Sequence, residues 1–252
     1  MVAVYKPKRH LSQNFLHNRQ LVKKLLSKSS IGKSDTVIEI GSGKGIITQE
    51  LAEKSNQVIS VEKDRRLTQF LSDKIPQNVV LFNFNALNYP LPQSEYKVFS
   101  NFPFSVQGKL FRKFIQADNP PRQMCVVVRK RSAFRWGGIK KSTQFSVLYR
   151  PWFDFSVEYY FKPTDFKPST QVEAVLLKED SKSNPLISNK DKSKYQQFIK
   201  QGFGGGRRIK QNLSGYFSID RLNEITQDIG ISINATPTEI GLDKWIKIFR
   251  EQ

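Results

Sequence analysis

The 252-residue chain carries 41 lysines and arginines but only 22 aspartates and glutamates, which gives a formal net charge of +19 at pH 7. A protein with this charge repels itself unless it meets a polyanion, so nucleic acid is the expected partner. The sequence contains no apolar run near the ~20 residues of a transmembrane helix and no signal-peptide core, and its single cysteine and two histidines exclude an internal disulfide and a Cys/His metal cluster. We therefore expect a cytoplasmic protein without a metal or a membrane anchor.

Short β-branched or aromatic runs alternate with helical patterns between Asp35 and about Lys178. The expected strands cover residues 36–40, 57–61, 79–83, 97–101, 124–128 and 172–177. The expected helices between them cover residues 48–54, 65–74 and 106–116. This alternation predicts an α/β fold with a mainly parallel sheet that is covered on both faces. Cys125 lies in the apolar run MCVVV, and we interpret it as a buried strand residue.

The C-terminal part of the chain has a different pattern. Residues 182–189 are rich in Ser, Asn and Pro and are typical of a linker. The segments that follow with helical spacing are 195–203, 218–230 and 237–249. The sequence therefore predicts two domains, a larger α/β domain over residues 1–180 with a basic N-terminal segment, and a small all-helical domain over residues 181–252.

Three segments concentrate the positive charge. Residues 1–34 hold eight lysines and arginines and no acid, residues 129–141 hold six and no acid, and residues 181–218 contain a single acid, Asp191. Each segment alone could be a solvated face, but three of them favour an extended track for nucleic acid. The aromatic residues Phe134, Trp136, Phe203 and Tyr216 are interleaved with the basic ones and suit base stacking. The residues that we assign to this track are Lys6, Lys8, Arg9, Arg129, Lys130, Arg131, Arg135, Arg207, Arg208 and Lys210.

Three positions at the ends of expected strands suggest a nucleoside cofactor. The glycine-rich run EIGSGKG, residues 39–45, lets backbone amides approach a ligand closely, although a simple tight turn is the alternative. Glu62 ends the next strand, where an acidic side chain can accept both ribose hydroxyls of an adenosine cofactor. Asn85 follows the third strand and can offer a donor and an acceptor to an adenine edge, although a turn asparagine fits the same position.

The tetrapeptide NFPF, residues 101–104, ends the fourth expected strand and should face the same crevice. Its chemistry suits an exocyclic amine, because the N6 lone pair of adenine is delocalised into the ring and attacks an electrophile poorly. If the Asn101 side-chain oxygen and the Phe102 carbonyl accept the two N6 hydrogens, the lone pair is aimed at an electrophilic methyl group. Pro103 stiffens the turn, and Phe104 can stack on a base extruded from its helix.

The ordered set of motifs resembles the rRNA adenine N6 methyltransferase family. It consists of HLSQNFL (10–16), EIGSGKG, Glu62, NFPF, PWFDF (151–155) and FKPSTQVEAVLL (166–177). PWFDF and the basic RKRSAFRWGG before it are more similar to the erythromycin-resistance (Erm) branch than to the small-subunit rRNA dimethyladenosine transferases. The resemblance implies a Rossmann-like S-adenosylmethionine-dependent methyltransferase fold with a seven-stranded sheet and a helical, RNA-binding C-terminal domain.

The resemblance also implies the reaction. S-adenosylmethionine is the expected methyl donor, and an adenine of large-subunit (23S) rRNA, methylated before full ribosome assembly, is the expected target of a monomeric enzyme. Such methylation confers resistance to macrolides, lincosamides and streptogramin B. Carried over by position, the cofactor-binding residues are Asn14, Leu16, Gly41, Gly43, Glu62, Lys63, Asn85 and Asn101, and the catalytic residues are Asn101, Phe102, Pro103 and Phe104.

Two departures and several alternatives accompany this interpretation. The family usually has Asp at the position of Asn85, and commonly an aliphatic residue and Tyr at the positions of Phe102 and Phe104. A small-subunit (16S) rRNA dimethyladenosine transferase uses the same chemistry on another target. A non-catalytic RNA-binding or transcription factor on this fold conflicts with the presence of Glu62 and Asn101, and a DNA adenine methyltransferase lacks support from the QNFL segment.

Overall fold

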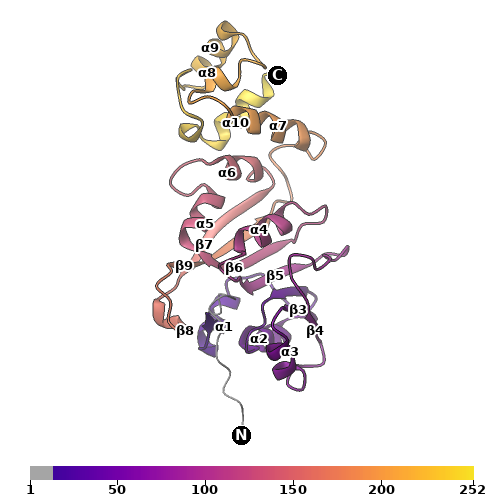
Figure 1. The fold of residues 1–252 in the computed structure, drawn as a ribbon. Helices are drawn as coiled ribbons and strands as arrows, with labels where there is room; N and C mark the ends of the chain where they lie inside the picture. The colour runs from indigo at the N-terminus through magenta and orange to yellow at the C-terminus, as the bar shows by residue number, and fades with distance from the viewer. Residues whose placement is uncertain (1–13) are drawn as a thin grey trace. The chain divides into compact units, whose positions relative to one another are not determined.

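The computed structural model describes residues 14–252 (Figure 1). The predicted RNA-binding residues Lys6, Lys8 and Arg9 lie outside this range. The chain divides into two compact units, one that extends to Ser132 and resumes over Phe155–Ser181, and one that comprises Ala133–Asp154 and Lys182–Gln252. The second unit thus includes residues 133–154, which precede the predicted domain boundary. The boundary between domains at residues 180 and 181 stays a prediction.

The first unit is built on a seven-stranded sheet with the order β4-β3-β2-β5-β6-β9-β7. Strands β2 to β6 pair in parallel, and β9 pairs antiparallel with β6. The mainly parallel sheet and the Rossmann-like α/β class are therefore confirmed. The strands are β2 (Thr36–Ile40), β3 (Gln57–Glu62), β4 (Val79–Asn83), β5 (Lys97–Asn101), β6 (Gln123–Arg129), β7 (Phe153–Tyr160) and β9 (Ala174–Ser181).

The strand order reverses direction at β2, and such a switch point is a usual position for a ligand-binding site. From β2 the chain moves outward to β3 and β4 on one side, and then returns to place β5 on the other side of β2. In an open α/β sheet, ligands bind outside the carboxyl ends of the strands at such a reversal. The carboxyl ends of β2 and β5 carry the glycine-rich run and NFPF, so the two motifs flank one crevice.

A second, two-stranded sheet connects distant segments of the first unit. β1 (Phe15–Leu16) pairs antiparallel with β8 (Phe166–Lys167), which follows the short 3-10 turn η2 (Pro163–Asp165). This pairing places Phe15 and Leu16 of the QNFL motif beside Phe166 and Lys167 of the FKPSTQ motif. Two motifs about 150 residues apart in the sequence therefore meet next to the crevice.

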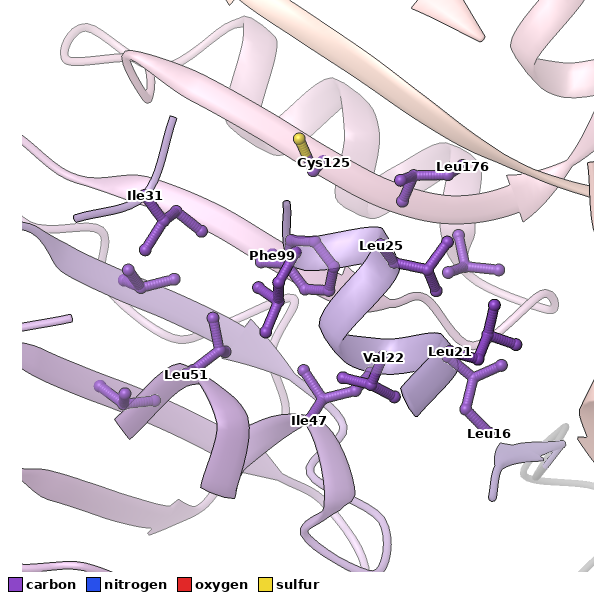
Figure 2. Packing of buried hydrophobic residues seen from close by; sticks show 14 of the residues in the cluster. Leu16, Leu21, Val22, Leu25, Ile31, Ile47, Leu51, Phe99, Cys125 and Leu176 are labelled. Atoms are coloured by element: carbon purple, nitrogen blue, oxygen red, sulfur yellow. The ribbon is translucent and has the colours of Figure 1, made fainter. Parts of the chain in front are cut away.

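Four helices accompany the sheet of the first unit, and α1 and α4 among them have a distinct apolar face. In α1, the Asn18 side chain accepts the Leu21 N–H and starts the helix, and Leu21, Val22 and Leu25 lie on its buried face. Figure 2 shows these side chains in the same buried cluster as Phe99 of β5, with Leu25 near the Phe99 ring. Cys125 belongs to the same buried cluster, as the sequence predicts. The helices are α1 (Arg19–Leu26), α2 (Ile46–Lys54), α3 (Arg65–Leu71) and α4 (Gln107–Ile115).

The second unit is helical around an aromatic core. Phe198 packs against the rings of Trp245 and Phe249, and the Tyr195 hydroxyl donates a hydrogen bond to the Val147 carbonyl over 3.0 Å. The elements are the end of α5 (Lys130–Gly137), α6 (Gln144–Tyr149), α7 (Lys192–Gly202), α8 (Ile209–Asn212), α9 (Ile219–Asp228), η3 (Pro237–Glu239) and α10 (Leu242–Arg250). Over residues 14–252, no helix is long and apolar enough to span a bilayer.

Candidate active site

A cavity of about 220 Å³ lies at the carboxyl ends of the central strands. It far exceeds the roughly 10–15 Å³ that one water molecule requires. Leu16, which is 4% exposed, belongs to the neighbouring hydrophobic core and does not line the cavity. The other predicted cofactor-binding and catalytic residues all line it, namely Asn14, Gly41, Gly43, Glu62, Lys63, Asn85, Asn101, Phe102, Pro103 and Phe104.

The glycine-rich turn between β2 and α2 requires glycine at its ligand-facing positions. Gly41 and Gly43 have φ angles of +79° and +56°, a left-handed conformation that side chains disfavour. A Cβ atom at Gly43 would lie 2.7 Å from the Phe15 ring, so the ring packs directly against the backbone of the turn. Phe15 also lines the cavity. Phe15 is not among the predicted site residues, although it stands inside the QNFL motif.

Glu62 is held as a fixed acceptor at the end of β3. Its Oε2 accepts the Gly43 N–H at 3.1 Å, and its Oε1 accepts the Asp64 N–H at 2.8 Å. Burial raises the pKa of Glu62, and these backbone donors act against that rise. Each carboxylate oxygen keeps acceptor capacity beyond these bonds. The side chain can therefore bind vicinal hydroxyl groups in the cavity without having to move.

A second carboxyl group lies behind the turn. Glu39 of β2 is fully buried, and its Oε2 accepts hydrogen bonds from Thr48 Oγ1 at 2.6 Å and from Ser60 Oγ at 2.9 Å. Burial raises the pKa of Glu39 to about 7, with a smaller contribution from the charge of Glu62. The sequence analysis assigned no role to Glu39, because a strand residue shows its partners only after folding.

The side-chain amide of Asn101 has a defined orientation. Its Nδ2 donates a hydrogen bond of 2.8 Å to the Asn14 carbonyl. A carbonyl can only accept, so the nitrogen must face Asn14 and Oδ1 remains available as an acceptor. Phe102 is buried and stacks on Phe114 with ring centroids 6.1 Å apart, and its N–H donates to the Val127 carbonyl. These bonds anchor the backbone of the NFPF turn. The turn still presents two oxygen atoms that can accept hydrogen bonds, Asn101 Oδ1 and the Phe102 carbonyl oxygen.

Phe104 lines the cavity, but most of its surface is buried. The residue is 6% exposed, and its ring meets Phe166 edge-on at 6.4 Å. The Arg129 guanidinium lies over the ring, 5.8 Å from its centroid. Base stacking on Phe104 stays a prediction, and it would require the Arg129 side chain to share or leave this ring.

The loop after β4 forms another wall of the cavity. Asn85, Ala86 and Leu87 line it. Lys113 of α4 donates hydrogen bonds to the carbonyls of Ala86 at 2.9 Å, Leu87 at 3.1 Å and also Tyr89. Partial burial lowers the pKa of Lys113. This lysine connects the helix that follows NFPF to the loop that follows β4, and no local sequence signal predicts that contact.

The predicted RNA-binding residues in the described part of the chain differ in their surroundings. Lys130 pairs with Glu173 at 2.9 Å, which raises the lysine pKa, so part of its charge is compensated. Arg131 and Arg135 are exposed on α5. Arg207 is exposed in the loop between α7 and α8, while Arg208 at the end of that loop and Lys210 in α8 are half-buried.

The aromatic residues expected to interleave with the basic ones serve mainly the second unit itself. Trp136 is 7% exposed, and Phe203 stacks on Trp245 with centroids 5.4 Å apart. Tyr216 remains 36% exposed. Base stacking by these residues stays a prediction, and Tyr216 is the most exposed of the three.

The residues of the cavity fit a nucleoside cofactor with a methionine chain. The backbone of the glycine turn lines the cavity at Gly41 and Gly43, Glu62 offers fixed acceptors for a ribose, and Asn101 lies beside them with its Oδ1 turned away from the Asn14 carbonyl. A Rossmann-like sheet with this arrangement defines an S-adenosylmethionine-dependent methyltransferase that acts on an amine.

Comparison with known proteins identifies the family. The model of the ribosomal RNA adenine dimethylase family matches residues 4–252, and the chain belongs to this family. The ribosomal RNA small subunit methyltransferase A of Caldanaerobacter subterraneus subsp. tengcongensis is 27% identical over 96% of each chain. An rRNA adenine N-6-methyltransferase of Bacteroides fragilis is 26% identical over 97% of this chain and 93% of its own. These two relatives, which carry different names, match the chain at nearly equal identity.

Solved structures share the fold. The 23S rRNA methyltransferase ErmE matches with a TM-score of 0.83 and 21% identity, over 94% of this chain and 98% of ErmE. A dimethyladenosine transferase from Plasmodium falciparum matches with a TM-score of 0.76 and 17% identity, over 94% and 96% of the two chains. The protein is an rRNA adenine methyltransferase with S-adenosylmethionine as its methyl donor.

Proposed function

We propose that this enzyme methylates N6 of an adenine in large-subunit (23S) rRNA, before full ribosome assembly, and so confers resistance to macrolides, lincosamides and streptogramin B. The orientation of Asn101 carries the N6 chemistry, because its hydrogen bond to Asn14 leaves an oxygen acceptor in the cavity. The choice of 23S rRNA is supported by the likeness of PWFDF and the preceding basic segment to the Erm branch.

The residues of the NFPF turn have separate tasks in this proposal. Asn101 Oδ1 and the Phe102 carbonyl accept the two N6 hydrogens and orient the lone pair of the amine. Bound S-adenosylmethionine supplies an electrophilic methyl group on a sulfonium. The buried rings of Phe102 and Phe104 keep water away from the amine. A strong base is unnecessary, since the methylated amine is cationic and loses its proton readily to solvent.

Positive charge binds the RNA in this proposal. Arg129, Arg131 and Arg135 supply phosphate contacts from β6 and α5, and Arg207 with its neighbours supplies them from the second unit. Such contacts give affinity without sequence information. Selection of a particular adenine therefore depends on RNA shape and on which base can be extruded into the cavity.

Primer extension on 23S and 16S rRNA tests the target. If two methyl groups are added, cells that produce the wild-type chain should give a new stop at one adenine of 23S rRNA, because a dimethylated N6 cannot pair, and cells with Asn101→Ala should not. Mass spectrometry of the digested rRNA then distinguishes one added methyl group from two. A stop in 16S rRNA instead would support the small-subunit alternative, which the relative from Caldanaerobacter represents.

A further inference from the structure

The loop Asn85–Tyr89 is fixed from within and from outside. Within the loop, the Asn85 carbonyl accepts the N–H groups of Asn88 at 2.9 Å and Tyr89 at 3.1 Å. From outside, the Lys113 ammonium binds the carbonyls of three other loop residues, as described above. These bonds hold Asn85 at the cavity wall in one backbone conformation. The chemistry that this wall presents to a ligand thus depends on how the Asn85 side chain is turned.

One hydrogen bond determines that orientation. Asn85 Oδ1 accepts the Leu87 N–H at 3.2 Å. A backbone N–H can only donate, so the amide cannot be reversed without losing this bond. The oxygen is therefore already engaged, whereas the two Nδ2 hydrogens have no acceptor within residues 14–252. Asn85 lines the cavity with unused donors.

We propose that Asn85 recognises the adenine of the methyl donor by donating a hydrogen bond to a ring nitrogen, N1, and not by accepting one from the N6 amino group. The inference rests on the proposed function, in which this cavity holds S-adenosylmethionine. Adenine presents the N1 acceptor beside the N6 donor on one edge. A side chain with spare donors matches N1, and its engaged oxygen is the weaker partner for the amino group.

Substitution by aspartate reverses this polarity with little change of shape. In Asn85→Asp, one carboxylate oxygen keeps the Leu87 N–H, and the other replaces the NH₂ group with an acceptor. The variant should therefore select the N6 amino group and disregard N1. Asn88→Asp is a matched control, since Asn88 is exposed on the same loop and does not line the cavity.

Calorimetry with three ligands tests the proposal without measuring activity. The ligands are S-adenosylhomocysteine, its 1-deaza analogue, which lacks N1, and its 6-deamino analogue, which lacks the amino group. For wild type and Asn88→Asp, the loss of N1 should weaken binding about 3- to 10-fold and the loss of the amino group less than about 2-fold, as expected for one neutral hydrogen bond. For Asn85→Asp, the two effects should exchange.

Two results would overturn the inference. One is a wild-type protein that loses more affinity with the amino group than with N1. The other is an Asn85→Asp variant with the same ligand preferences as wild type. Either result would leave the 23S assignment intact, because the rRNA target is read by primer extension. Conversely, methylation of an RNA other than 23S rRNA would not affect the proposal that Asn85 donates a hydrogen bond to N1 of the methyl donor.

Discussion

The two units of the molecule differ in the polar groups that they offer to a ligand. In the first unit, Glu62, Asn101 and Asn85 are each oriented by a hydrogen bond to backbone, and each keeps unused capacity toward one cavity. In the second unit, Arg207 lies exposed on a loop, and the buried interior is aromatic. Selective chemistry requires groups fixed before the substrate arrives. Attraction of a polyanion requires mainly the number and accessibility of charges.

The largest expected effect tests whether the oriented polar groups of the first unit carry the chemistry. Asn101→Ala removes the fixed acceptor, so the single-turnover rate of methylation of an rRNA hairpin should fall about 10²- to 10³-fold, as for loss of one preorganised hydrogen-bonding group. Affinity for RNA should remain within about 2-fold, because phosphate contacts elsewhere supply it. Asn88→Ala, outside the cavity, should keep the wild-type rate. A normal rate in Asn101→Ala would require a different active site.

A substitution of Phe104 can affect folding stability as well as activity. Phe104 is packed in the core, so Phe104→Ala would remove buried ring area at a cost of about 3–5 kcal/mol of folding stability. A loss of activity in that variant would not separate stacking from folding. Phe104→Tyr retains the ring and adds only a hydroxyl group, which makes it the more informative change.

The buried Glu39 carboxyl of the first unit should make the folding stability of the protein depend on pH. Its pKa is about 7 in the folded protein, above its ordinary value of 4.5, so folding favours the protonated carboxyl. The stabilisation is complete below about pH 4.5 and is lost as the pH rises through 7, a change of about 3 kcal/mol in the free energy of unfolding. Glu39→Gln should lack this dependence, match wild type near pH 4.5 and be more stable at pH 8. Urea denaturation at both pH values measures the difference, and parallel pH profiles for the two proteins would contradict it.

The sequence was sufficient for the parts of the fold whose signals are local. Strands β2, β3 and β5 are apolar runs that stop at a glycine, a glutamate and an asparagine, and parallel pairing then brings these ends together. Helix α1 is not among the predicted helices, because its four buried residues stand among lysines in the basic N-terminal segment. Its signal, an Asn18 cap before paired apolar residues, was nevertheless present.

The finer features of the site could not be predicted in this way. Position in the chain placed Asn85 at the crevice, but the direction of its amide depends on the Leu87 N–H, which only the folded loop supplies. Lys113 gives no sign in sequence that it binds three carbonyls of a loop 24 to 27 residues away. Hydrogen-bond polarity is a property of the tertiary structure, whereas apolar periodicity can be seen in the chain.

The smallest expected effect concerns the exposed charges of the second unit. Each phosphate neutralised by a cation contributes about 0.7 to 0.9 to the slope of log affinity against log salt. Arg207→Ala should lower the slope by about that amount, and Arg208→Ala by less, because the Arg208 guanidinium already donates to the Asn234 carbonyl.

Filter binding of an rRNA hairpin from 50 to 300 mM salt measures the slope, and calorimetry with S-adenosylhomocysteine should show unchanged cofactor affinity in both variants. The matched control removes Arg122 and Arg221 together, whose charges are paired with Glu95 and with Glu224 and Glu251. Because those charges are already compensated, the control should leave the slope almost unaltered. If Arg207→Ala behaved like this control, the loop between α7 and α8 would not contact RNA, and accessible charge alone would be a poor guide to the binding track.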